Sequence, residues 1–411
     1  MTGLIHSVTK ASLWTPSFIF IMAANGLLFM AFEMLLPTLP LFVSSIGGGA
    51  SQIGLVTGIF TVSAILIRPF AGVLTTRFNK KILLIIGMAI CALSTGLYYL
   101  SSDVWILLII RLIHGIGFGL ATIYITTIAA ENMPKERMGE AMGYFGVGET
   151  IAISLGPVIG ISVLQAFDFN GMFWSAMAIS LLAILFASIT SRKSEFINEN
   201  EHENTPTSKF KWVEKRVLLP SILIFLTGIA AGGVISFTVL YAIDKGFHLI
   251  AWFFFITAAS GLLVRVISGK MFDRYGPGVV LIPSGIITIA GFIVLLLAQN
   301  DLQFLIAGLL YGSGFGAIFP ALLTWCLNLV EEYERENAIA SFFNFFDFGL
   351  GGGSIILGLV AEAFSYQAVY YVAIVAYVLF LLTYFIFSGS KNRDIIAVGN
   401  LKGEDKVSTF H

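Results

Sequence analysis

Long apolar segments separated by short polar connections run through nearly the whole chain. A helix needs about 20 mainly apolar residues to cross the hydrocarbon core of a bilayer. Segments of this kind lie at roughly 17–43, 52–76, 82–100, 104–130, 138–166, 170–190, 217–243, 250–273, 278–298, 302–330, 336–363 and 367–388. The pattern predicts an all-α integral membrane protein with twelve transmembrane helices.

One long polar stretch, SRKSEFINENEHENTPTSKFKWVEKR at 191–216, separates the first six spans from the last six. We therefore expect an N-terminal six-helix bundle, a linker, a C-terminal six-helix bundle and a tail. Their boundaries are 1–190, 191–216, 217–390 and 391–411.

Positive charges are distributed very unevenly between the two faces that alternating spans define. Of the 23 lysines and arginines, 19 fall on the face that holds the N-terminus, Lys245 alone falls on the opposite face, and three lie inside spans. Cytoplasmic loops of membrane proteins carry the excess of Lys and Arg. We expect a multi-pass protein of the cell membrane with both termini in the cytoplasm.

Composition excludes several other classes of protein. Hydrophobic residues make up 57% of the 411 residues and charged residues only 11%, whereas soluble domains carry about 25% charged residues. The net charge of −1 favours no nucleic-acid partner, and two separated cysteines and five scattered histidines form no metal motif. The sequence also contains no nucleophile–base pair and no phosphate-binding loop. We therefore expect that the protein is not an enzyme and that it binds no metal or cofactor.

The two halves of the sequence repeat with a constant offset of 197 residues. The stretch RLIHGIGFG at 111–119 aligns with GLLYGSGFG at 308–316, so the glycines recur but Arg111 and His114 do not. Six spans separate the copies, which predicts two bundles of the same topology with substrate bound between them near the midplane. We interpret the alternating glycines as close helix packing.

Two loop motifs and a span-four motif carry a resemblance to a known family. The loop sequences are GVLTTRFNKK at 72–81, with Gly72 and Arg77, and GKMFDRYGPG at 269–278, with Gly269, Asp273 and Arg274. Together with the span-four arginine and its glycines, they resemble the motifs of the major facilitator superfamily over nearly the whole chain. The resemblance implies twelve helices in two pseudosymmetric bundles.

Span five adds a resemblance to the drug/proton antiporters of that family. Its sequence GYFGVGETIAISLGPVIGI at 143–161 is similar to their antiporter signature, and Gly156-Pro157 can kink the helix. We expect the two loop motifs and this kink to act in gating. Since Thr76 replaces the acidic residue of the first loop, Asp273 is expected to dominate, so Asp273→Asn should reduce transport more than a change at Thr76.

Ionisable residues inside the spans are the candidates for proton coupling, because burying a charge in lipid is expensive. They are Glu33, Arg111, His114, Glu149 and Asp347. Helix rise places Glu33 and Arg111 at a similar depth, about 20–22 Å from the inner face, where they could pair. Desolvation favours a neutral carboxyl and a nearby arginine favours an ionised one, and this competition suits a proton relay.

The candidate substrate contacts are polar or aromatic residues near the expected cavity. They are Asn25, Tyr241, Asn344 and Phe345, the last two within the run FFNFFDF at 342–348. Aromatic rings stack on flat or cationic molecules, although packing is the simpler interpretation of any single ring.

These features predict a proton-coupled exporter of small amphipathic or cationic molecules, acting by alternating access as a monomer in the lipid bilayer. Two alternatives stay open: an uptake symporter for a sugar, organic acid or other nutrient, and a lipid-handling membrane protein. The sequence leaves sodium open as the coupling ion. The presence of Arg111 and His114 in the first copy alone favours the N-terminal bundle as the site of coupling.

Overall fold

The computed structural model describes residues 13–75, 77–134, 138–190, 214–331 and 334–404. The chain divides into two compact units, Met1–Asn204 and Thr205–His411. This boundary falls within the expected linker at 191–216, most of which lies outside the described residues.

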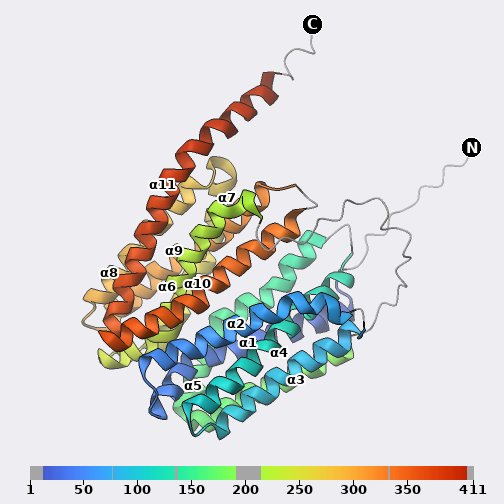
Figure 1. The fold of residues 1–411 in the computed structure, drawn as a ribbon, viewed down its shortest axis with the longest axis vertical. Coiled ribbons are helices and arrows are strands. Elements are labelled where there is room, and N and C mark those ends of the chain that lie inside the picture. The colour runs from blue at the N-terminus through green and yellow to red at the C-terminus, as the bar shows by residue number, and fades with distance from the viewer. Residues whose placement is uncertain (1–12, 76, 135–137, 191–213, 332–333, 405–411) are drawn as a thin grey trace, which may run out of the picture. The chain divides into compact units, whose positions relative to one another are not determined.

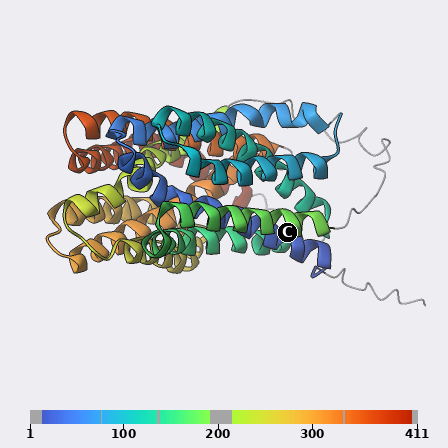
Figure 2. The same ribbon diagram turned by 90° about the horizontal axis from the view of Figure 1, so that it is seen from below.

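The first unit consists of helices that run alongside one another (Figures 1 and 2). They are α1 (Pro16–Ser45), α2 (Ala50–Thr75), α3 (Lys80–Leu97) with the 3-10 turn η1 (Tyr98–Leu100), α4 (Val104–Glu131) and α5 (Met138–Ile189). Side chains that accept from the first-turn amides mark the start of α1 and α4, where Thr15 binds the Phe18 N–H and Asp103 binds the Trp105 N–H. Such caps satisfy amides that have no partner within the helix.

Helix α5 contains two predicted spans. Backbone angles leave the helical region at Phe167 and at Asp168, whose φ is 57°. Its apolar stretch, Tyr144–Ile189, has 46 residues, or about 69 Å at 1.5 Å per residue, which is about twice the thickness of the hydrocarbon core. The described residues hold eleven helical stretches long and apolar enough to cross a membrane, and the break in this one gives the twelve crossings expected.

The second unit repeats the arrangement. Its helices are α6 (Leu218–Asp244), preceded by the 3-10 turn η4 (Lys215–Val217), α7 (Ile250–Tyr275), α8 (Gly278–Leu297), α9 (Asp301–Asn328), α10 (Arg335–Ala363) and α11 (Tyr366–Glu404). Helix α11 continues into the expected tail, and its apolar crossing ends at Phe387. An offset of 197 residues superimposes the bounds of α4 on those of α9, and the cap Asp103 corresponds to Asn300.

Alternating glycines let α4 and α9 approach their neighbours through equivalent contacts. A Cβ added to Gly119 would lie 2.7 Å from the carbonyl oxygen of Ala64 on α2, and one added to Gly316 would lie 2.7 Å from that of Gly261 on α7. Ala64 and Gly261 are themselves 197 residues apart. Since real Cβ contacts are essentially never that close, the glycines serve helix packing in both units.

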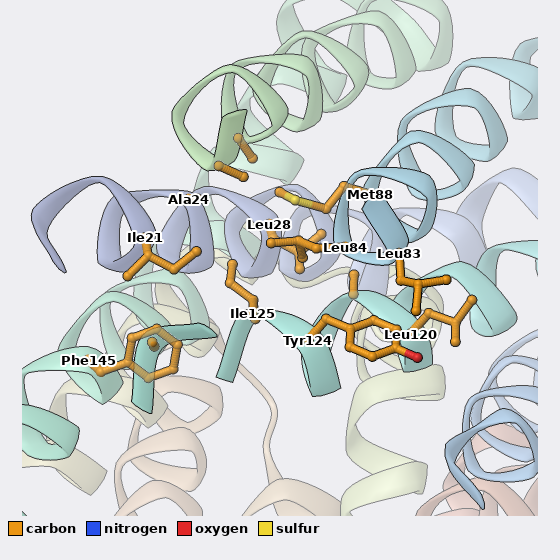
Figure 3. Packing of buried hydrophobic residues seen from close by; sticks show 14 of the residues in the cluster. Ile21, Ala24, Leu28, Leu83, Leu84, Met88, Leu120, Tyr124, Ile125 and Phe145 are labelled. Atoms are coloured by element: carbon orange, nitrogen blue, oxygen red, sulfur yellow. The ribbon is translucent and has the colours of Figure 1, made fainter. Parts of the chain in front are cut away.

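The core of the first unit is an apolar cluster contributed by several helices (Figure 3). Figure 3 shows Leu28 of α1, Leu84 and Met88 of α3, and Ile125 of α4 meeting in this cluster. This packing fixes α1, which carries Glu33, and α4, which carries Arg111 and His114, relative to α3.

Candidate functional site

Arg111 lies inside the first unit with only 1% of its surface exposed. Its Nε donates to the carbonyl oxygen of Val56 on α2 over 3.1 Å, and its Nη1 donates to the hydroxyl of Tyr98 over 3.5 Å. The guanidinium carbon also sits 4.1 Å from the ring centre of Phe60 and 5.8 Å from that of Phe32. A carbonyl, a hydroxyl and aromatic faces therefore surround this cation.

His114, one helical turn after Arg111 on α4, shares the Tyr98 hydroxyl. The Tyr98 oxygen is 2.7 Å from His114 Nδ1, and His114 is 2% exposed. The ring of Phe60 meets the imidazole edge-on, with the ring centres 5.4 Å apart. Tyr98 was missed by the sequence analysis, because a tyrosine at the end of an apolar span looks the same whether it anchors the span or binds an arginine.

Two acidic side chains lie on the adjacent helices α1 and α5. Glu33 on α1 and Glu149 on α5 are both half-buried. Gly156 of α5 packs against Glu33: an added Cβ would lie 3.3 Å from Glu33 Cα and closer still to its Cβ. Gly26 and Gly148 meet in the same way, with a Cβ added to Gly26 lying 3.2 Å from Gly148 Cα. The glycines therefore bring α1 and α5 close together, with the Glu33 backbone against Gly156 and the residue before Glu149 against Gly26.

The structure separates two groups that the sequence analysis paired. Among the described residues, no ion pair within 4.0 Å joins Glu33 to Arg111. Phe32, the neighbour of Glu33, does approach the guanidinium. Phe32 also stacks on Phe60, with ring centres 4.9 Å apart, so aromatic rings occupy the region beside Arg111 where the ion pair was expected.

Asn25 is 1% exposed on α1. Its Nδ2 has no hydrogen-bond partner among the described residues. An unsatisfied buried donor costs about 1–3 kcal/mol, so its presence calls for an explanation such as a functional role or a bound molecule. Asn25 therefore keeps its place among the candidate substrate contacts.

The candidates of the second unit occupy two different environments. Tyr241 is 0% exposed on α6, and its hydroxyl donates to the carbonyl oxygen of Leu295 over 3.1 Å. Its ring packs edge-on against Tyr370, which makes Tyr241 a core residue that joins helices in this structure. By contrast, Asn344, Phe345 and Asp347 are half-buried on α10.

Residues expected to act in gating lie at helix ends or within α5. Arg77, Gly269, Asp273 and Arg274 are exposed, and Arg274 sits 5.1 Å from the ring centre of Tyr275. Gly72 lies within α2, and Thr76 lies outside the described residues. Gly156 and Pro157 are buried, but the non-helical backbone angles of α5 occur ten residues later, at Phe167 and Asp168.

The two lysines that end the first loop motif bind other helices of the first unit. Lys80 forms an ion pair with Glu131 at the end of α4. Lys81 donates to the carbonyl oxygens of Ser188 and Thr190 over 2.7 and 2.8 Å, where a positive charge is favourable at the C-terminal end of α5. The loop motif thus ties α3 to the ends of α4 and α5.

Within the described part of the chain, no three His, Cys, Asp or Glu side chains come together where a metal ion could bind. Cys91 and Cys326 are both buried and free.

Comparison with known families agrees with the resemblance found in the sequence. The family profile described as "Major Facilitator Superfamily" matches residues 21–350, and a second match covers residues 249–401. The chain belongs to the major facilitator superfamily. It is therefore a secondary transporter with multiple membrane crossings and not an enzyme, as the sequence predicted.

Curated superfamily relatives match most of the chain. The multi-drug resistance efflux pump PmrA of Streptococcus pneumoniae is 25% identical over 84% of this chain and 90% of its own length. The multidrug resistance protein MdtG of Enterobacter lignolyticus is 27% identical over 83% and 85%. The quinolone resistance protein NorA of Staphylococcus aureus is 23% identical over 75% and 80%.

Solved structures of superfamily transporters share the fold. The nucleoside transporter NupG has a TM-score of 0.74 at 16% identity, covering 90% of this chain and 99% of its own. A bacterial homologue of the human lysosomal transporter Spinster, in an inward-facing and occupied conformation, has a TM-score of 0.71 at 16% identity, with coverages of 92% and 97%. Both likenesses concern the fold alone.

Proposed function

We propose that the protein is a proton-coupled exporter of small amphipathic or cationic molecules in the cell membrane. It would act as a monomer with both termini in the cytoplasm, and its two six-helix bundles, 1–190 and 217–390, would rock about a substrate site to alternate access. The names of the relatives support export, since PmrA is called an efflux pump and MdtG and NorA are called resistance proteins.

The placement of Glu33 and Glu149 on the packed neighbouring helices α1 and α5 carries this proposal. Both carboxyls lie on apolar spans, Glu33 on α1 and Glu149 on α5. Ionised carboxyls within a membrane are costly and usually serve transport or proton relay. Two carboxyls on neighbouring helices repel each other when both are ionised, which favours binding of a proton by one of them.

In the proposed cycle, proton binding and substrate binding exclude one another. With the outer side open, a proton binds Glu33 or Glu149 and displaces a cationic substrate. With the inner side open, the proton leaves, and the restored negative charge attracts the next substrate molecule. Arg111 belongs to the same unit and adds a positive charge there, with His114 one helical turn away, and Asp347 on α10 is the acidic candidate of the second unit.

The candidate substrate contacts are polar and aromatic groups of each unit. Asn25 offers an unpaired buried amide on α1, and Asn344 and Phe345 are half-buried on α10. An amide and a ring suit molecules with both a polar group and a flat apolar part. Tyr241 does not join this set, because its hydroxyl is bound to Leu295.

The proposed gates are the two loop motifs, with Gly72 and Arg77 in one and Gly269, Asp273 and Arg274 in the other, together with Gly156-Pro157 in α5. Asp273 is exposed at the end of α7. It can therefore meet a helix N-terminus in one conformation and leave it in another.

Transport by purified protein in liposomes with an imposed pH gradient tests the proposal. A panel of amphipathic cations, nucleosides and sugars would be offered. We expect cations to move against the direction of proton movement, with Glu33→Gln or Glu149→Gln lowering gradient-driven transport by about tenfold or more. Glu131→Gln is the matched control, since that carboxyl pairs with Lys80 at a helix end.

Two results would contradict the proposal. One is transport that ignores the gradient and is unchanged in both glutamine variants. The other is substrate movement in the same direction as the protons, which would identify an uptake symporter.

A further inference from the structure

Arg111 carries a buried positive charge that neutral groups hold. Its described contacts are the Val56 carbonyl, the Tyr98 hydroxyl and the rings of Phe60 and Phe32. A guanidinium has only donors, so every polar contact in this set uses an oxygen as acceptor. The orientation of the Tyr98 hydroxyl hydrogen therefore decides what else the group can bind.

A hydroxyl has a single hydrogen, and this fixes which groups donate and which accept in the hydrogen bonds that link Arg111, Tyr98 and His114. Tyr98 accepts a hydrogen bond from Arg111 Nη1. Its own single hydrogen is then free for its other close neighbour, His114 Nδ1, at 2.7 Å. A histidine nitrogen accepts only when it carries no proton, so this order requires a neutral His114 with its proton on Nε2.

A protonated His114 would break this order. Both neighbours of the Tyr98 oxygen would then be donors, and the hydroxyl hydrogen would lose its acceptor. Among the described residues, the other side chains that contact Tyr98 and His114 are the rings of Phe60 on α2 and Phe173 on α5, which supply no replacement carboxylate. Arrangement and charge both favour a neutral imidazole beside the guanidinium.

We propose that Tyr98 and His114 are positioning residues that hold Arg111 against Phe60, and that His114 acts as a hydrogen-bond acceptor instead of a proton carrier. This inference rests on the proposed function, because its consequence is that Arg111 is placed for proton coupling on α4. It revises the role expected for His114 from sequence.

The second unit lacks this chain of contacts. With the offset of 197 residues, Leu295, Gly308 and Tyr311 stand where the first unit has Tyr98, Arg111 and His114. The glycine contacts of α4 and α9 are nevertheless equivalent. The three polar residues are thus an addition to a shared scaffold and are not needed to build it.

Four variants separate positioning from proton carriage. His114→Asn retains an acceptor oxygen near the place of Nδ1 but cannot take up a proton there, and His114→Leu removes the acceptor. Tyr98→Phe removes the hydroxyl between the two residues. Tyr124→Phe is the matched control, because that tyrosine is equally buried in the same unit and donates to the Ala71 carbonyl over 2.8 Å.

Each variant would be reconstituted and assayed for transport driven by a pH gradient and for substrate counterflow without a gradient. We expect Tyr98→Phe and His114→Leu to lose about tenfold in the first assay while counterflow stays within about twofold. His114→Asn and Tyr124→Phe should stay within about threefold of the unmodified protein in both assays.

Three transport outcomes would overturn the inference. They are a His114→Asn variant as defective as His114→Leu, an unaffected Tyr98→Phe variant, or an equal loss of counterflow and gradient-driven transport. A protein whose unmodified form ignores the gradient would overturn the proposed function instead.

A spectroscopic measurement tests the proton order without any transport. In protein labelled with 15N-histidine, the signals that vanish in His114→Asn belong to His114, one of five histidines. We expect an unprotonated Nδ1 and a protonated Nε2 at neutral pH. A proton on Nδ1 would overturn the inference whatever the transport assays show.

Discussion

Replacing Gly156 by alanine should push α1 away from α5 at the point where Glu33 sits. The added Cβ would lie 3.2 Å from the Glu33 carbonyl carbon, 3.3 Å from its Cα, and less than 3.0 Å from its Cβ. Ordinary contact begins at 3.4 Å. These atoms belong to the backbone or lie next to it, so rotation of a flexible side chain cannot relieve the clash, and the helices must separate.

The size of the effect follows from two opposing terms. Alanine is favoured over glycine inside a helix by about 1 kcal/mol, and forcing an extra methyl into close packing costs about 1–3 kcal/mol. Gly146 lies on the same helix, and a Cβ added there meets nothing within 4 Å. Gly146→Ala should therefore gain the helix-propensity contribution of alanine without the cost of close packing. We expect Gly156→Ala to have the lower free energy of unfolding, by about 1–3 kcal/mol.

Denaturant unfolding of both purified variants in detergent micelles measures this difference, and gradient-driven transport shows its functional consequence. We expect transport to fall in Gly156→Ala, because Glu33 moves relative to Glu149, and to be unchanged in Gly146→Ala. Equal stability of the two variants would refute the close packing of α1 on α5 around Glu33.

The glycine repeat and the lysines of the first loop lead to two more predictions. Gly115→Ala and Gly312→Ala should each lower the melting temperature, because the added Cβ meets a backbone carbonyl of the facing helix. Gly269→Ala is the control and should leave the melting temperature unchanged, since a Cβ added there has no neighbour within 4 Å. Equal melting temperatures of the three variants would contradict the packing role of the glycines. Lys81→Met should lower the free energy of unfolding, measured with denaturant, by about 0.3–1 kcal/mol. The loss should exceed that of Lys80→Met, because Lys81 binds two carbonyl oxygens at a helix end while Lys80 forms an exposed ion pair. A larger loss in Lys80→Met would refute the capping role of Lys81.

The sequence predicted the fold well because its strongest signals are length, hydropathy and repetition. The break between spans five and six was expected between 166 and 170 and occurs at Phe167 and Asp168. The offset of 197 residues holds for the bounds of α4 and α9 as well as for their glycine contacts. These features depend on the period and composition of one segment at a time, which a single sequence contains.

The candidate site was predicted less completely, because depth in the membrane does not determine direction around a helix. Helix rise placed Glu33 and Arg111 at one depth, but the rings of Phe32 and Phe60 occupy the space beside the guanidinium. Tyr98 went unnoticed, and Tyr241 turned out to be a core residue. Each of these outcomes depends on which side chain of a neighbouring helix faces a given position, and periodicity contains no such information.

Proton movement driven by substrate tests the central claim most directly. Liposomes containing the protein and a pH-sensitive dye would receive a substrate gradient at equal pH on both sides. We predict proton movement opposite to the substrate, lost in both Glu33→Gln and Glu149→Gln and retained in Glu131→Gln. Substrate transport without proton movement, or proton movement that persists in both glutamine variants, would contradict the claim that these two carboxyls couple protons to export.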